Sequence, residues 1–354
     1  MTASSVSYKV AASSMRSIVK FWSRPSHLRA TLLGVALLFA LAIPVAAQEG
    51  RRLRAGYASL SGNITPLWAA REAGIFKKNG LDIDLVAFPA GTEGMAAMIA
   101  GEIEFLAIAG STTASAAIGG AEVFTMALIN DRLLTSLVVG PTIQKPEDLR
   151  GKSIGISRFG TSIDTAARIA IQHYGMEPNK DVSLVQVGAV SSAVAALRGG
   201  RIHAAILSYP TIIYARREGF REMLDIASLG TPYAANGITL RRSFMQQKRE
   251  VTLSYLKSIL EAIARIKKDK PFAVEVMGKY LRTKDKELLD QTYEFAITKY
   301  LKARPYPTAE AFRSVIDELA QVNPKAKGQD PRKFYDDSLL QELDKSGFIN
   351  ALYR

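Results

Sequence analysis

Short loops rich in Gly, Ser, Thr and Asn recur along this 354-residue chain and carry its best candidates for chemistry. Each loop comes between an apolar, strand-like run and a helix-like segment. A helix that starts there leaves backbone amides free, and free amides beside hydroxyls suit the oxygens of an anion. We therefore expect a ligand-binding site formed by Ser61, Gly62, Asn63, Gly91, Thr92, Ser111, Thr112, Arg158, Gly160, Thr161, Ser162, Gly188, Ser208 and Tyr209.

These residues have a second interpretation, because Ser and Thr at helix starts commonly cap the helix. For Thr92, Ser111, Thr161 and Ser162 taken singly, capping and ligand contact are equally supported. The ligand interpretation depends on six such loops converging on one place, which capping does not require. Arg158 adds a guanidinium whose fork matches a carboxylate or sulfonate, although a loop arginine is often only solvated.

The residue types needed for metal binding and catalysis are scarce. The chain has no Cys and three His, which excludes a disulfide, a thiolate zinc site and a cysteine nucleophile. It also lacks a nucleophile elbow, a metal-binding histidine pair, a GxxxxGK phosphate loop and a dinucleotide-binding Gly-x-Gly cluster after its first strand. We expect no metal, no cofactor and no catalytic centre.

An internal repeat positions the loops. Residues from Gly56 to Thr112 match residues from Gly155 to Thr211 without gaps, at a constant offset of 99 residues. A chance match between alanine-rich units is the alternative, but the constant phase over a whole copy argues against it. The matched positions include Gly56 with Gly155, Ile64 with Ile163, Asp82 with Asp181, Gly101 with Gly200 and Ile103 with Ile202.

Each copy alternates strands and helices, which predicts an α/β lobe with a parallel sheet and right-handed crossovers. Ligands bind beyond the carboxyl ends of such strands, so the loops of the two lobes should face one site. We expect the first part of lobe 1 in residues 48–140, lobe 2 in residues 141–230, and a return to lobe 1 with C-terminal helices in residues 231–354. Leu137–Val139 is expected to be a strand that precedes the first crossing.

The first 47 residues have the layout of an export signal. An apolar run at residues 30–45 follows basic residues and precedes small ones, so we expect cleavage after Ala47. A retained membrane anchor is the alternative, although the run is shorter than the roughly 20 apolar residues of a spanning helix. Met1 and Met15 are both candidate translation starts. The net charge of +13 favours the binding of anionic solutes. The basic residues of the chain are scattered, so they do not predict nucleic-acid binding.

A set of short motifs runs through the mature chain. After Gly56-Tyr57 and Ser61-Gly62-Asn63 comes the stretch EAGIFKKNGLD at residues 72–82. Later landmarks are LRGKSIG at residues 149–155 and SGFI at residues 346–349. Together they resemble the nitrate/sulfonate/taurine family of ABC transporter substrate-binding proteins, and the resemblance covers essentially the whole mature chain.

The resemblance implies a periplasmic-binding-protein-like fold of type II, with two α/β lobes, a hinge and C-terminal helices. It implies a periplasmic protein that captures a small anionic molecule, such as a sulfonate, a nitrate-like ion or an organic acid. The implied partners are an ABC permease and ATPase in the inner membrane, and we expect a monomer. An exported enzyme or ligand sensor on the same fold is the alternative, and turnover of a bound compound would identify the enzyme.

Overall fold

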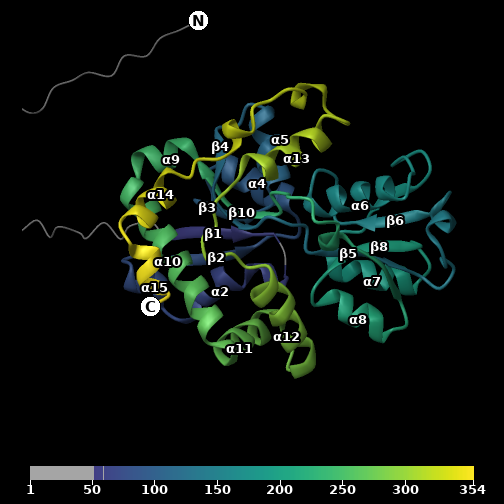
Figure 1. Ribbon diagram of the computed structural model, residues 1–354, viewed down its shortest axis with the longest axis horizontal. Helices are drawn as coiled ribbons and strands as arrows, with labels where there is room; N and C mark the ends of the chain where they lie inside the picture. The colour runs from purple at the N-terminus through teal and green to yellow at the C-terminus, as the bar shows by residue number, and fades with distance from the viewer. Residues whose placement is uncertain (1–51, 59) are drawn as a thin grey trace, which may run out of the picture. The chain divides into compact units, whose positions relative to one another are not determined.

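The computed structural model describes residues 52–58 and 60–354, and the predicted export signal lies outside them. Within this range no helix is long and apolar enough to cross a membrane. The described chain forms two five-stranded β-sheets with helices packed around them (Figure 1).

The two sheets are built from corresponding strands. The first contains β1 (Leu53–Tyr57), β2 (Ile83–Ala87), β3 (Phe105–Ile108), β4 (Val123–Asn130) and β10 (Asn236–Arg241). The second contains β5 (Thr135–Val139), β6 (Ser153–Ile156), β7 (Ser183–Gln186), β8 (Ala204–Ser208) and β9 (Arg221–Asp225). Their strand orders, β2-β1-β3-β10-β4 and β7-β6-β8-β5-β9, are equivalent, so each repeat copy supplies the first three strands of one sheet.

Helices connect the strands of each copy and then cover the first lobe. The first copy contains α2 (Thr65–Glu72), α3 (Ile75–Lys78), α4 (Gly91–Ile99) and α5 (Gly110–Ile118). The second contains α6 (Ser162–His173), α7 (Val190–Arg198) and α8 (Thr211–Arg217). After β10 come α9 (Arg242–Gln247), α10 (Arg249–Lys268), α11 (Lys270–Leu281), α12 (Lys286–Tyr293), α13 (Ala309–Leu319), α14 (Ser338–Lys345) and α15 (Phe348–Leu352). Figure 1 shows α10, α11, α14 and α15 beside the first sheet, where the sequence placed the C-terminal helices.

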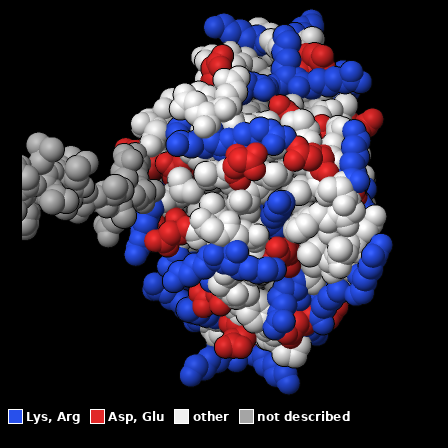
Figure 2. Space-filling view, turned by 90° about the vertical axis from the view of Figure 1, so that its left-hand side faces the viewer, with Lys and Arg blue, Asp and Glu red and all other residues white. Residues whose placement is uncertain are grey.

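The C-terminal helices carry many of the basic residues. Figure 2 shows Lys and Arg interspersed with Asp and Glu over one face, rather than gathered into one basic patch. Several of these charges are paired, including Lys78 with Glu261 on α10 and Arg249 with Glu342 on α14. Exposed ion pairs of this kind contribute little to stability, but they leave a surface on which positive and negative charges alternate.

The sequence repeat has a packing basis. A Cβ on Gly56 of β1 would come within 2.7 Å of Ile103 Cδ1, and a Cβ on Gly155 of β6 within 2.5 Å of Ile202 Cδ1. In each lobe the isoleucine before the third strand therefore fills the space that the glycine of the first strand leaves. A larger residue at either glycine would overpack a buried layer.

The position of β5 corrects the predicted lobe boundary. β5 pairs antiparallel with β8 and β9 of the second sheet, so the chain crosses between the lobes at residues 131–134 and not after residue 140. All five residues of β5 are buried, and an apolar run gives no sign of which sheet will bury it. The three strands of each copy are parallel as expected, whereas β10 and β5 add an antiparallel fourth strand to each sheet.

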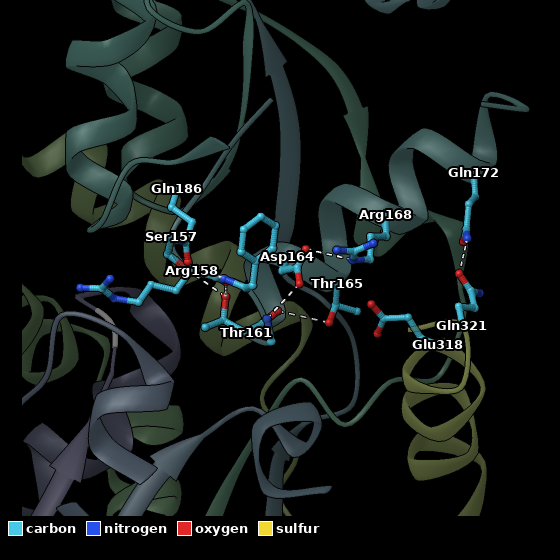
Figure 3. Close-up of polar contacts among 12 residues, drawn as sticks. Ser157, Arg158, Thr161, Asp164, Thr165, Arg168, Gln172, Gln186, Glu318 and Gln321 are labelled. Carbon is cyan, nitrogen blue, oxygen red and sulfur yellow. Dashed lines mark hydrogen bonds and ion pairs between the residues drawn. The ribbon is translucent and has the colours of Figure 1, made fainter. Parts of the chain in front are cut away.

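The two crossing segments are joined at a buried polar cluster. The amide of Tyr233, in the returning segment, donates to the carbonyl of Asp131 in the outgoing segment at 2.8 Å. The Tyr233 hydroxyl lies 3.0 Å from Thr165 Oγ1 of α6 and 2.9 Å from Glu318 Oε2 of α13. Figure 3 shows the Glu318 side chain directed from its helix toward Thr165. The cluster thus connects the second lobe, the hinge and a C-terminal helix.

The surroundings of Glu318 favour its neutral form. Burial raises the pKa of the Glu318 carboxyl to about 7, and the negative charge of Asp164 acts in the same direction. Hydrogen bonds from Tyr233 and Thr165 and the charge of Arg168 partly oppose this rise in pKa. Arg168 is itself paired with Asp164 at 3.0 Å, so these charges largely offset each other.

This cluster predicts a pH-dependent stability. Glu318 has a usual pKa of 4.5, so the folded protein holds the proton more tightly than the unfolded chain does. Raising the pH from about 4.5 to about 7 should therefore lower the free energy of unfolding, by roughly 3 kcal/mol at most. Glu318→Gln cannot ionise and should reduce the fall in melting temperature between pH 5 and pH 8. Glu310→Gln, at an exposed position of the same helix, is the control, and an equal pH dependence in both variants would contradict the assignment.

Candidate ligand-binding cleft

A cavity of about 790 Å³ lies at the strand ends of both sheets. Its walls include the residues that follow or end β1, β2, β3, β6 and β8, so it occupies the edge where parallel strands place their carboxyl ends. Both lobes contribute in similar measure. A cavity of this volume is in the usual range for a small-molecule site.

The structure brings half of the predicted site residues to this cavity. The residues that line it are Ser61, Asn63, Gly91, Thr112, Thr161, Ser162 and Ser208. The residues that lie outside its lining are Gly62, Thr92, Ser111, Arg158, Gly160, Gly188 and Tyr209. Adjacent residues of one loop thus differ in whether they reach the cavity.

Several of the residues outside the lining join the two lobes instead. Arg158 Nη2 lies 2.7 Å from Glu93 Oε1 of α4, so its guanidinium is paired across the cleft and not open to a ligand. Figure 3 shows the Arg158 side chain extending away from Thr161 and Asp164. The Gly160 carbonyl accepts a hydrogen bond from Thr112 Oγ1 of the first lobe at 3.2 Å.

The opposite side of the cleft is held in a similar way. The amide of Gly62 donates to the carbonyl of Tyr209 at 3.4 Å, and the Tyr209 ring stacks on Phe295 with ring centroids 4.3 Å apart. Arg217 of α8 also pairs with Asp285 and Glu287 near α12. The lobes thus touch on both sides of the cavity.

The helices that start at the cavity have no side-chain cap. The N-cap residues of α4, α5, α6 and α7 are Ala90, Ala109, Thr161 and Ala189, and none accepts a hydrogen bond from its helix. By contrast, Asp or Thr side chains cap α11, α12 and α13. Other helices, among them α2, α10 and α14, also lack a side-chain cap, but the uncapped starts of α4, α6 and α7 lie at the cavity, where their first-turn amides can donate to acceptor oxygens.

Capping does not account for the predicted hydroxyls. Thr161 is an N-cap residue, but its hydroxyl donates to the carbonyl of Arg158 at 2.8 Å and lies 3.0 Å from Ser157 Oγ. Ser111 and Thr92 follow the alanines that occupy the N-cap positions of α5 and α4. The capping interpretation is thus wrong for these three residues.

Sequence reasoning missed several polar residues of the cavity lining, among them Thr135, Ser157 and Asn236. Thr135 begins β5 and Asn236 begins β10, and these antiparallel strands start at the edge where the parallel strands end. Ser157 matches Ala58 in the repeat, and both line the cavity. The offset of 99 residues could have identified Ser157, but Thr135 and Asn236 required knowledge of the strand exchange.

Thr135 differs from the other hydroxyls in its environment. Its side chain is 6% exposed, and its Oγ1 has no hydrogen-bond partner among the described residues. A buried hydroxyl without a partner costs roughly 1–3 kcal/mol relative to one that is satisfied. Thr135 lines the cavity, but its hydroxyl oxygen is shielded from solvent, so contact with a bound molecule requires a rotation of the side chain.

Charges are few in the lining. Its only charged side chains, within the described chain, are Arg198 and Glu218, and they form a two-contact ion pair with Arg198 Nε 2.9 Å from Glu218 Oε2. In residues 52–58 and 60–354 no group of three His, Asp or Glu side chains is placed to hold a metal ion. Hydroxyls, amides and apolar groups therefore make up the open part of the walls.

Two lobes of equivalent topology, exchanged fourth strands and a cleft between them define the type II periplasmic-binding-protein-like fold. The alkanesulfonate-binding protein SsuA of Xanthomonas axonopodis pv. citri, solved bound to MOPS, has this fold with a TM-score of 0.66. It is 16% identical in sequence, and the comparison covers 83% of this chain and 98% of that one. The sequence pattern of the NMT1/THI5-like family matches residues 61–270, and the chain belongs to that family.

Curated relatives are more similar in sequence but match only part of the chain. A putative binding protein of Brucella abortus is 28% identical over 202 residues, which are 56% of this chain and 61% of that protein. The taurine-binding periplasmic protein of Escherichia coli is 28% identical over 193 residues, or 52% of this chain and 58% of that protein. The chain thus matches less than two thirds of the length of these relatives.

The unpartnered hydroxyl gives the first prediction about the cleft. Thr135→Val keeps the side-chain shape and removes a hydroxyl that has no hydrogen-bond partner among the described residues, so the melting temperature should stay unchanged or rise. Affinity for a small molecule released from the unfolded protein should fall by about 3- to 10-fold, the effect of one hydrogen bond. Calorimetry measures the affinity, with Thr252→Val on α10 as a control far from the cavity. Unchanged affinity would show that Thr135 makes no ligand contact.

The Arg158–Glu93 ion pair gives a second prediction about the cleft. Both side chains are about two-fifths exposed, so the pair contributes modestly, by about 1 kcal/mol or less. Arg158→Gln should open the unliganded lobes slightly, seen as a larger radius of gyration in X-ray scattering, and weaken ligand binding by less than about fivefold. Glu93→Gln and the double variant should behave alike. If Arg158→Gln abolishes binding while Glu93→Gln does not, Arg158 contacts the ligand directly.

Proposed function

We propose that this protein is the solute-binding component of an ABC import system. It captures a small molecule between its two lobes and delivers it to a permease and an ATPase in the inner membrane. The observation that carries the proposal is the cavity itself, in which uncapped helix starts from both lobes meet. The family match and the binding functions named for the relatives support the same role.

The ligand in this proposal carries an acceptor group, such as a carboxylate or a sulfonate. First-turn amides of α4, α6 and α7 supply partial positive charge without a cationic side chain, whereas the first amide of α5, on Gly110, donates to the carbonyl of Ala234. The basic composition of the chain raises the local concentration of anions in the same direction.

The cellular setting follows from the sequence. The layout of residues 1–47 supports export to the periplasm, with removal of the signal after Ala47. A single chain supplies both walls of the cavity, which fits a monomer. Among the described residues of the lining there is no histidine and no unpaired carboxylate to act as a base, so a receptor explains it better than an enzyme does.

Expression of the full chain in a Gram-negative host tests this proposal. The protein should be recovered from the periplasm with Gln48 as its first residue, and it should release an intact small molecule when it is unfolded. Adding that molecule back at about 100 times its dissociation constant should add roughly 2.7 kcal/mol of apparent stability. Recovery with the membrane fraction would contradict signal cleavage, and chemical conversion of the molecule would favour the enzyme alternative.

A further inference from the structure

The walls of the cavity combine polar and apolar side chains. The polar ones include Ser157 and Thr161, just before α6, and Thr135, at the start of β5. The apolar side chains come from both lobes: Leu60, Ile64, Phe88 and Ile108 from the first, and Val190, Val194 and Tyr214 from the second. A water-filled cavity gains nothing from such walls, whereas an apolar ligand body does.

Two of these residues are exposed in a way that is unusual for their type. Leu60 is 57% and Tyr214 39% exposed, and they are among the few large apolar residues left open in the described chain. Each lines the cavity from a different lobe. Exposed apolar side chains that gather at a concave site mark a surface that a partner or ligand covers.

Two glycines leave the space that the aromatic ring of Phe88 occupies. A Cβ on Gly56 would come within 2.8 Å of the Phe88 ring, and one on Gly94 within 3.3 Å. Any larger residue at these positions would displace the ring. The apolar wall of the first lobe is therefore fixed before a ligand arrives, which lowers the entropic cost of binding.

The charges of the lining restrict the ligand further. Glu218 is occupied by two contacts from Arg198, and Glu93 at the edge of the cleft is occupied by Arg158. No other acidic side chain lies in the described lining. An ammonium group on the ligand would thus lose its hydration without gaining a partner, which is unfavourable.

From these observations we propose that the ligand is an organic monoanion with a bulky apolar body and no ammonium group. Its carboxylate or sulfonate binds at the helix starts and Thr135, and its body lies between Phe88 and Ile108 on one side and Val194 and Tyr214 on the other. A bound inorganic anion would leave the apolar side chains of the walls in contact with water. A bound zwitterion would leave its ammonium group without an acidic partner. This proposal depends on the proposed function and defines its substrate class.

Matched sulfonates test the proposal by calorimetry on the mature protein freed of endogenous ligand. Propane-1-sulfonate and taurine have nearly the same shape and differ in a methyl or an ammonium group, and benzenesulfonate and methanesulfonate differ in the size of the body. We expect propane-1-sulfonate to bind at least 10-fold more tightly than taurine, and benzenesulfonate at least 10-fold more tightly than methanesulfonate or nitrate. Equal or reversed preferences in either comparison would overturn the proposal.

Variants assign these preferences to the named walls. Val194→Ser should weaken benzenesulfonate at least fivefold while changing methanesulfonate by less than twofold. Arg198→Gln frees the Glu218 carboxylate and should shift the preference between taurine and propane-1-sulfonate at least fivefold toward taurine. Arg216→Gln, which breaks a similar pair with Glu222 outside the cavity lining, is the control and should shift nothing.

A result in which no sulfonate binds is also decisive. Mass spectrometry of the molecule released from the protein then identifies the ligand class directly. An apolar-bodied carboxylate would uphold the proposal, whereas an inorganic ion, a zwitterion or a cation would overturn it and leave the receptor function intact. If the protein releases no molecule and binds no sulfonate, the result would count against both the ligand proposal and the receptor function.

Discussion

The exchange of one strand between the lobes is the constraint on which the rest of the structure depends. Each sheet receives its fourth strand only after the chain has left the other sheet: β5 follows β4 into the second sheet, and β10 follows β9 into the first. Both exchanged strands are buried between two neighbours. The first sheet therefore cannot be completed until residues 53–241 are all in place, whereas the strands of the second sheet are contiguous between residues 135 and 225.

Strand exchange also determines what the cleft contains. An exchanged strand runs antiparallel to its neighbour, so its first residue lies where the parallel strands end. Thr135 and Asn236 reach the cavity for this reason. It also brings the two crossing segments together, where the Tyr233 amide bonds to Asp131 and its hydroxyl to Glu318. Ligand cleft and hinge are two consequences of one topology.

The sequence predicted the parts of this fold that local pattern controls. The repeat predicted two α/β lobes and all six connecting loops, because Gly56 and Gly155 and their isoleucine partners impose the same packing twice. It did not predict which sheet β5 joins, since a buried apolar strand looks the same in either place. It also placed Arg158 in the site, because sequence does not reveal that Glu93 of the other lobe lies 2.7 Å away.

The helix starts in the cleft differ in one respect from what the sequence predicts. The sequence predicts free amides and hydroxyls together, but the N-cap residues at three of the four helix starts in the cleft are alanines, Ala90, Ala109 and Ala189. Replacing a good cap by alanine costs a helix about 1 kcal/mol. Side chains of Asp or Thr cap α11, α12 and α13, whereas the helix starts in the cleft have no side-chain cap. Uncapped starts also occur at α2, α10 and α14, so it is the position of the cleft helices at the cavity, and not the missing caps alone, that gives their amides access to a ligand.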